Sequence, residues 1–331
     1  LPQPKTPYDL LIRVTAVALN PTDYKMPQHY PTPGATMGCD FVGTVIQSGT
    51  AADITLPAPG TRVCGAVHGS NPADPTNGAF AEYLVADARL VIRVPDNWSD
   101  LDAAALGGIG WGTLGLAFYA HLGLEGRPAA PLQGKKVPVL VYGGATATGT
   151  MACQLLSLAG YDPIATTSAA SADLVRSYSA TSTVPYTAPD CGSRIKAEMK
   201  GGLRHALDCI SSPESVRVCC EALGRAGGRC ASLEFCPEEW RTRKAVRVEM
   251  VLGYEMFGRG LELEGVYKRE ADLGKLELSV GWCREVQGLV ERGVLRSHPV
   301  REVEGGWDGV VRGLEMLRGG EVRGEKLVVR L

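Results

Sequence analysis

One stretch constrains this chain more than any other: a strand that runs straight into a glycine-rich turn and then into a helix. Residues 139–149 read Val-Leu-Val-Tyr-Gly-Gly-Ala-Thr-Ala-Thr-Gly, and a helical pattern follows from Thr150 to Ala159. Small residues at such a turn let backbone N–H groups and the start of the helix approach a phosphate. The stretch predicts a βαβ unit and therefore a parallel sheet.

The turn departs from two phosphate-binding patterns. Gly144 and Gly149 have the spacing of a Walker A loop, but Thr150 and Met151 follow where that loop needs Lys and then Ser or Thr, which excludes it. Against the dinucleotide pattern G-x-G-x-x-G, Thr146 replaces the middle glycine. The turn alone therefore leaves open a tight strand-to-helix connection that binds no ligand.

The end of the next strand favours a phosphorylated dinucleotide. NAD-specific domains place Asp or Glu there for the ribose 2′-hydroxyl. This chain has Thr166-Thr167-Ser168 instead, with no acid before Asp173, and Arg176 follows in the next helix. Hydroxyls and a guanidinium bind a 2′-phosphate that a carboxylate would repel. We therefore predict NADPH as the cofactor, although Arg176 by itself also fits a solvated helix face.

The order of the elements predicts an α/β protein in which a doubly wound parallel sheet accompanies a smaller, mainly β domain. Strands are expected in the first 95 residues at 10–19, 41–45, 62–67, 80–85 and 90–94. Ser99-Asp100 is a plausible helix start. Strands at 137–142, 163–167, 203–210 and 228–233 then alternate with helices at 150–159, 172–179 and 215–223. Beyond residue 258 we expect a helix at 273–293, a strand at 300–303, a helix at 307–317 and a final strand at 326–331 that returns to the first domain.

Composition excludes several classes of partner. With 34 basic and 36 acidic residues the formal charge is −2, so no net positive field favours a nucleic acid or an anionic membrane. The ten cysteines include no CxxC pair, which favours a reduced, cytoplasmic protein. The segment from Ala103 to Leu124 has 22 residues without Asp, Glu, Lys or Arg and is long enough to span a membrane. Six of them are glycines, so we expect buried core helices instead.

Several motifs, in this order and spacing, resemble the medium-chain dehydrogenase/reductases in their zinc-free quinone oxidoreductase and enoyl reductase branch. They are ALNPTDYK at 18–25, GCDFVGTV at 38–45, GTRV at 60–63, GAFAEY at 78–83, the turn at 139–149 and GEKLV at 324–328. The turn, together with ALDCI at 206–210, GRAGG at 224–228, TRK at 242–244 and the last eight residues, is similar to the trans-acting enoyl reductases of fungal highly reducing polyketide synthases. The resemblance implies a GroES-like substrate domain, 1–117 and 262–331, and a Rossmann NADPH-binding domain, 118–261.

The resemblance also bears on metal. Zinc-dependent members hold the metal through a Cys and a His at places that Asn20 and Cys39 occupy here. With two ligands replaced, and no four-cysteine lobe after Gly78-Ala79, we expect no bound zinc. Hydride addition to an activated C=C needs only a cofactor and a group that receives developing enolate charge, whereas alcohol oxidation relies on a Lewis acid.

The resemblance assigns roles to individual residues. Lys25 and Thr113 match the catalytic positions beside the nicotinamide. The implied cofactor-binding residues are Thr22, Asp23, Tyr24, Lys25, Ala145, Thr146, Ala147, Thr148, Ser168, Ala169, Ala170, Ser171, Arg176, Tyr186, Leu233, Glu234, Glu321 and Val322. The implied acyl-pocket residues are Leu114, Gly115, Leu116, Ala117, Phe118, Tyr119, Ala120, His121, Tyr254, Glu255, Met256, Phe257 and Gly258.

The function implied by the resemblance is NADPH-dependent reduction of an α,β-unsaturated thioester. The acyl carrier protein of a highly reducing polyketide synthase would present this substrate and dock only transiently, and we expect a monomer rather than a dimer. Two alternatives stay open at this stage: a stand-alone quinone or enone reductase of the same fold, and a non-catalytic NADPH-binding protein. The residue types also leave plain readings open, because Lys25 fits a surface lysine after a turn and the apolar stretches fit core or domain interface.

Overall fold

The computed structural model describes residues 2–331. It divides into two compact units, one formed by the residues up to Gly112 together with Tyr254–Leu331, the other by Thr113–Gly253. The boundaries expected from the sequence, 117/118 and 261/262, lie a few residues further along the chain. The second boundary comes earlier because Tyr254 hydrogen-bonds to Thr22, and Met256 packs at Gly112, within the first unit.

The first unit is built on a mainly antiparallel sheet in the order β12-β13-β1-β2-β3-β5, with β4 also paired to β1. The sequence prediction that the final strand returns to the first domain is confirmed, since Val329 of β13 pairs with Val17 of β1. The long, mostly buried β1 carries the core of this unit. The strands are β1 (Asp9–Ala18), β2 (Asp40–Gln47), β3 (Arg62–Ala66), β4 (Tyr83–Asp87), β5 (Val91–Arg93), β12 (Val300–Glu302) and β13 (Lys326–Arg330).

The helices of this unit are held by helix caps and by buried hydrogen bonds. The expected start at Ser99 is confirmed, because its side chain accepts from the Asp102 amide at 3.1 Å. The indole of Trp282 donates to the Trp111 carbonyl at 2.7 Å, and both side chains are fully buried. The helices are α1 (Pro21–His29), α2 (Asp100–Leu106), α3 (Ile109–Gly115), which crosses the unit boundary, α8 (Leu273–Glu291) and α9 (Gly306–Arg318), with short helical turns η1 (Ala88–Leu90), η5 (Gly253–Phe257) and η6 (Gly265–Tyr267).

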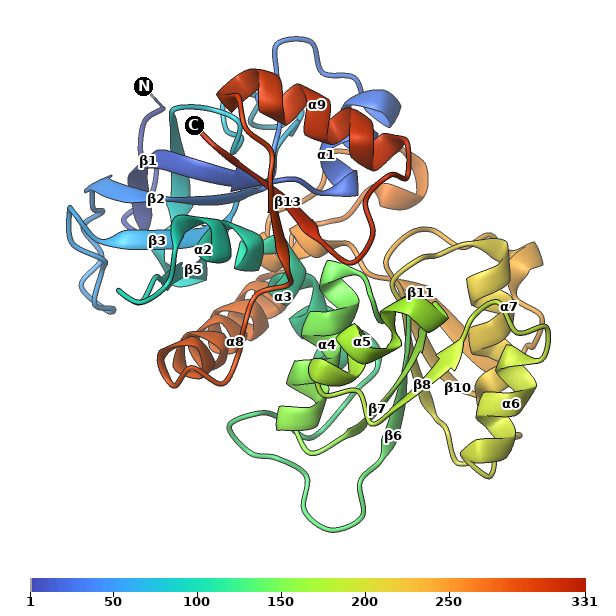
Figure 1. Cartoon of the computed structure of the whole chain (residues 1–331). Helices are drawn as coiled ribbons and strands as arrows, with labels where there is room; N and C mark the ends of the chain where they lie inside the picture. Colours follow the sequence, from blue (N-terminus) through green and yellow to red (C-terminus); the bar gives the residue numbers. More distant parts are fainter. Residues whose placement is uncertain (1) are drawn as a thin grey trace. The chain divides into compact units, whose positions relative to one another are not determined.

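The second unit is a six-stranded parallel sheet in the order β11-β10-β9-β6-β7-β8, the doubly wound order expected for a dinucleotide-binding domain. In Figure 1, α4 and α5 lie on one side of this sheet, and α6 and α7 lie on the other. The strand order reverses between β6 and β9, where ligands of such sheets bind at the carboxyl ends. The strands are β6 (Pro138–Tyr142), β7 (Asp162–Thr167), β8 (Ser182–Pro185), β9 (His205–Asp208), β10 (Gly228–Ser232) and β11 (Val246–Met250).

The sequence analysis missed both edge strands of this sheet, β8 and β11. An edge strand has one neighbour and is buried less, so β8 ends in a proline and β11 alternates with charges. It also missed α1 and α6, which are short and lack a long apolar period. The helical elements of this unit are η2 (Leu116–His121), α4 (Ala147–Leu158), η3 (Ala169–Ser171), α5 (Ala172–Ser177), α6 (Cys191–Glu198), α7 (Pro213–Ala222) and η4 (Glu238–Trp240).

The apolar segment that passes the length and hydropathy test for a membrane span runs from Asp100 to His121. It is broken at Gly107, where φ is +53°, into α2 and α3, and then continues as a π-helical turn. Of its most apolar window, 72% is buried inside the protein. The expected pair of buried core helices is therefore what forms there.

Candidate active site

The turn after β6 shows why this chain has a threonine between its two glycines. Thr146 caps α4, since its Oγ1 accepts from the Gly149 amide at 3.0 Å and donates to the Gly143 carbonyl at 2.8 Å. A Cβ on Gly149 would lie 2.3 Å from the Gly143 carbonyl oxygen, and one on Gly144 would lie 2.7 Å from Ala165 Cβ. Glycine is therefore required at both flanking positions, while the middle position serves as the helix cap.

The carboxyl edge of the parallel sheet fits a dinucleotide. The N-terminus of α4 opens beside the strand-order reversal, and it presents amide N–H groups that the helix itself leaves unpaired. The four residues expected at the pyrophosphate, Ala145 to Thr148, come together here and are half-buried. Thr167 Oγ1, at the end of β7, is buried without a hydrogen-bond partner. An orphaned hydroxyl at this place is the kind of group that a bound ligand satisfies.

The residues expected at a 2′-phosphate gather after β7 and β8. Ser168 caps η3 by accepting from the Ser171 amide at 3.3 Å. Arg176 donates to Thr183 Oγ1 at 2.7 Å and to Asp173 at 3.0 Å, and Tyr186, directly after β8, is exposed. The Arg176 side chain is 52% exposed, so its ion pair with Asp173 contributes little.

The last residue of β9, Asp208, has a role that the sequence analysis missed. Asp208 is fully buried and accepts from the amides of Ile210 and Ser211 at 3.0 and 2.9 Å and from the Ser215 hydroxyl at 2.6 Å. Burial raises the pKa of Asp208, and these hydrogen bonds oppose the rise. The carboxyl fixes the loop at the strand-order reversal. Leu233 and Glu234 follow the neighbouring strand β10, as expected.

In the first unit, α1 carries all four residues expected beside the nicotinamide: Thr22, Asp23, Tyr24 and Lys25. The Asn20 amide donates to Asp23 Oδ2 at 2.7 Å and closes the first turn, while Asp23 Oδ1 is buried without a hydrogen-bond partner. Burial raises the pKa of Asp23 to about 7, against the lowering effect of the Asn20 amide. Thr22 and Lys25 are three residues apart on the helix and both are half-buried, so they share one face.

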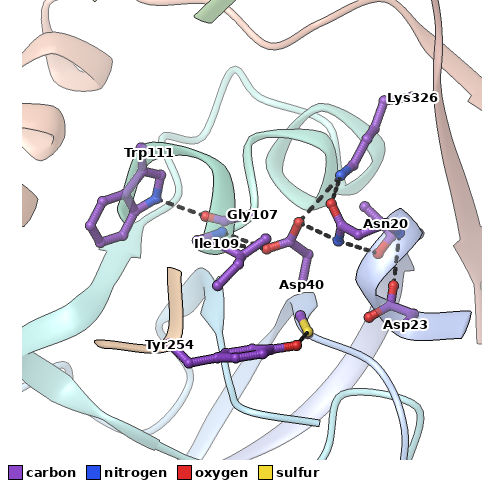
Figure 2. A network of polar contacts seen from close by, with 11 residues as sticks. Asn20, Asp23, Asp40, Gly107, Ile109, Trp111, Tyr254 and Lys326 are labelled. Carbon is purple, nitrogen blue, oxygen red and sulfur yellow. Dashed lines mark hydrogen bonds and ion pairs between the residues drawn. The ribbon is translucent and has the colours of Figure 1, made fainter. Parts of the chain in front are cut away.

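A buried polar network holds the start of α1 in place (Figure 2). Asn20 donates to Asp40 Oδ2 at 2.9 Å, and the Lys326 ammonium donates to Asn20 Oδ1 and lies 3.4 Å from Asp40 Oδ2. Asp40 Oδ1 accepts from the amides of Gly108 and Ile109 at 2.8 and 2.9 Å. The sequence analysis considered Asn20 only as a replaced zinc ligand, and it noted Lys326 only as part of a motif.

A second cluster surrounds the hydroxyl of Tyr254. This hydroxyl lies 2.9 Å from Thr22 Oγ1 and 3.2 Å from Cys39 Sγ, and the tyrosine ring stacks on His68 with ring centroids 3.7 Å apart. Figure 2 labels Tyr254 and marks the contact of its hydroxyl with the sulfur by a dashed line. Tyr254 was expected only as one residue of the acyl-pocket stretch 254–258. The contacts of its hydroxyl with residues more than 200 positions earlier could not be predicted from the sequence.

The other expected residues are distributed over both units. Thr113 is the first residue of the second unit, whereas Lys25 belongs to the first. Of the expected acyl-pocket residues, 114–121 belong to the second unit and 254–258 to the first. Glu255 forms its ion pairs within its own unit, because its Oε1 pairs with Lys275 and lies 3.5 Å from Arg269. Glu321 and Val322 lie in the loop between α9 and β13.

Metal ligands do not gather in the part of the chain that the structure describes: residues 2–331 contain no group of three or more His, Cys, Asp or Glu side chains placed to hold an ion. The two positions that the sequence analysis compared with zinc ligands, Asn20 and Cys39, make other contacts in this structure. Asn20 is bonded to Asp40 and Lys326, and Cys39 lies against Tyr254. Absence of zinc in the purified protein stays a prediction.

A doubly wound sheet joined to a mainly antiparallel unit, with a dinucleotide-type turn, defines the fold of the medium-chain dehydrogenase/reductases. Residues 6–96 match the alcohol dehydrogenase GroES-like domain, and residues 147–243 match the zinc-binding dehydrogenase family. A solved alcohol dehydrogenase superfamily protein from Novosphingobium aromaticivorans has the same fold, with a TM-score of 0.75 at 20% identity over 100% of this chain and 93% of that one.

Two curated proteins of similar sequence define the class of enzyme more narrowly. The chain is 48% identical to the trans-enoyl reductase calK of Penicillium decumbens, covering 100% of this chain and 91% of the relative. It is 46% identical to the trans-enoyl reductase sthE of Phaeosphaeria nodorum, with the same coverage. The chain therefore belongs to the fungal trans-enoyl reductases, a family of medium-chain oxidoreductases that use a nicotinamide cofactor.

Proposed function

We propose that this enoyl reductase uses NADPH to reduce the α,β-double bond of acyl thioesters that the acyl carrier protein of a highly reducing polyketide synthase presents to it in the cytoplasm. The observation that carries the proposal is the full-length similarity to trans-enoyl reductases, combined with an α1 segment that keeps Lys25 beside Thr22.

The cofactor would lie along the carboxyl edge of the second unit. Ala145 to Thr148 would hold the pyrophosphate at the start of α4, and Ser168 to Ser171, Arg176 and Tyr186 would hold the 2′-phosphate. Leu233, Glu234, Glu321 and Val322 would border the nicotinamide. When bound, NADPH supplies the hydride that reaches the β-carbon of the enoyl thioester. A carboxylate at the end of β7 would oppose the phosphate, and this chain has none there.

Lys25 would stabilise the charge that develops on the thioester oxygen. Addition of hydride to the β-carbon leaves an enolate, and a fixed cation or hydrogen-bond donor near its oxygen lowers the barrier. Thr113 would add a second donor. The stretches 114–121 and 254–258 would line the acyl chain, and most of their side chains are apolar, as that role requires.

The test compares substrates at fixed NADPH. Purified protein should oxidise NADPH with crotonyl pantetheine thioester, faster with longer enoyl thioesters and fastest when the acyl group is loaded on the carrier protein. A simple quinone should be a poor substrate. Turnover of quinones together with no turnover of any thioester would replace the proposal with a quinone reductase. Tight NADPH binding without turnover of either substrate would indicate a non-catalytic NADPH-binding protein.

A further inference from the structure

The hydroxyl of Tyr254 joins two segments that lie far apart in the sequence. It lies 2.9 Å from Thr22 Oγ1 and 3.2 Å from Cys39 Sγ, and only 6% of the residue is exposed. The stacked His68 ring, tilted by 19° from the tyrosine ring, fixes the plane of the phenol. These three contacts therefore hold the Tyr254 hydroxyl in one position, within hydrogen-bond distance of Thr22.

Thr22 is the most exposed of the three residues Thr22, Tyr254 and Cys39. It is half-buried in the first turn of α1, one helical turn before Lys25, whereas Cys39 and Tyr254 are buried. A hydroxyl can pass a proton on one side while it receives another from a second hydroxyl on the other side. The order from the accessible end inward is Thr22, Tyr254 and Cys39.

Enoyl reduction needs two transfers, and the proposed function supplies a residue for only one of them. Lys25 would stabilise the enolate, but the α-carbon must then receive a proton. We propose that Thr22 delivers this proton and that Tyr254 is the positioning residue that orients the Thr22 hydroxyl and reloads it. This inference rests on the proposed function, since it requires an enoyl thioester substrate.

The step balances without a further reactant. The Thr22 O–H bond breaks as the new C–H bond forms at the α-carbon, and the enolate electron pair becomes that bond. The Tyr254 proton moves to Thr22 Oγ1 and leaves a tyrosinate. Water restores the tyrosine proton through Thr22 when the product has left. A thioester enolate is a far stronger base than a phenolate, which favours the transfer, while burial of the tyrosinate opposes it.

The surroundings of Tyr254 keep its phenol protonated before the reaction. Burial raises the pKa of Tyr254 well above its usual value, so the phenol stays protonated over the working pH range. His68 does not compete for the proton, because burial lowers its pKa to about 3 and its contact with Tyr254 is a ring stack. The remaining titratable groups near the hydroxyl are Cys39, which burial also keeps protonated, and Asp23.

The test follows the configuration of the product. An α-methyl enoyl pantetheine thioester is reduced with NADPH, and the ratio of the two α-epimers is measured together with kcat and KM. Wild type should give one epimer in large excess. Tyr254→Phe and Thr22→Val should lower kcat about 10²-fold, the usual contribution of a positioned acid, and give a nearly equal mixture, because water then reaches the enolate from either face. Thr22→Ser should keep the wild-type ratio.

Tyr8→Phe is the matched control, since it removes a tyrosine hydroxyl that bonds to exposed Asp53 at 2.6 Å, and it should change neither rate nor ratio. A variant that loses rate but keeps the wild-type epimer ratio would show a merely structural role and overturn the inference, as would wild-type behaviour of both Tyr254→Phe and Thr22→Val. If Tyr254→Phe does not fold, the Thr22→Ser and Thr22→Val pair decides alone. A wild type that reduces no thioester would instead overturn the proposed function.

Discussion

The ammonium of Lys326, in the last strand, lies 3.4 Å from the carboxylate of Asp40, at the start of β2, and both side chains are almost completely buried. Asn20, which precedes the helix that carries Lys25, bridges the two. The C-terminal strand therefore fixes the beginning of the proposed catalytic helix through one buried ion pair.

Removal of the Lys326 cation should be strongly destabilising. Lys326→Met leaves the Asp40 carboxylate buried without its countercharge, and we expect the free energy of unfolding in urea to fall by about 3 to 5 kcal/mol. The double variant Lys326→Met with Asp40→Asn should recover part of this loss, because no unpaired charge remains.

The matched control is Lys5→Met, which breaks the pair with Asp74 at 3.0 Å, where the lysine side chain is 63% exposed. It should cost less than about 1 kcal/mol. Equal losses in Lys326→Met and Lys5→Met would contradict the role given to the buried pair.

The elevated pKa of Asp23 makes its contribution to stability dependent on pH. The folded value of about 7 lies above the ordinary 3.8, so the folded state favours the protonated carboxyl. This contribution is fully present below about pH 4 and is lost as the pH rises through about 7. Asp23→Asn keeps an oxygen that can accept from the Asn20 amide, so it should gain stability over wild type between pH 4 and 7, by at most about 4 kcal/mol. The measurement is urea unfolding of both proteins at several pH values; a difference that does not vary with pH would contradict it.

Much of the fold could be predicted because the patterns that indicate its strands and helices lie in continuous stretches of the sequence. Examples are the strand–turn–helix at 139–159 and the apolar strands of both sheets. In each, neighbouring residues along the chain show the apolar pattern of the element. The edge strands β8 and β11 could not be predicted, because one covered side leaves only a weak apolar signal.

In the candidate site, Lys25 and the turn were found through local motifs. The contacts of Lys326 with Asn20 and of Tyr254 with Thr22 join residues far apart in the sequence, and only the folded chain brings them together.

Loss of the Lys25 ammonium should lower the rate and leave the fold intact. We expect Lys25→Ala to reduce kcat for enoyl thioesters about 10²- to 10³-fold, the usual cost of losing one group that stabilises a developing oxyanion. Lys244→Ala removes an exposed lysine of the other unit and serves as control. NADPH binding, followed by nicotinamide fluorescence, should persist in both variants. A wild-type rate in Lys25→Ala would refute its proposed role.

Cofactor preference should depend on Arg176. Wild type should prefer NADPH over NADH by at least about tenfold in kcat/KM, since a charge-assisted contact to phosphate contributes about 1.5 to 3 kcal/mol. Arg176→Ala should erase most of this preference by raising KM for NADPH alone. Arg194→Ala, which removes an exposed arginine paired with Glu198 on α6, should not. Equal kinetics of the wild type with both cofactors would show that the 2′-phosphate is not recognised.

Activity should be independent of metal. Protein purified without added metal should contain far less than one zinc per chain, and treatment with a chelator should leave the rate of enoyl reduction unchanged. The physical reason is that Asn20 and Cys39 stand where two ligands would be needed. One tightly held zinc per chain would show that these positions were misinterpreted.

The strand β13 lies between β1 and β12, and its pairing with β1 extends to Arg330. Synthesis on the ribosome therefore treats the two units differently. The stretch Thr113–Gly253 is continuous and can fold while the chain is still growing. The sheet of the unit that holds Lys25 and Thr22 is complete only after β13 has been made, so a chain that stops between Gly253 and β13 contains a complete parallel sheet and an incomplete antiparallel one.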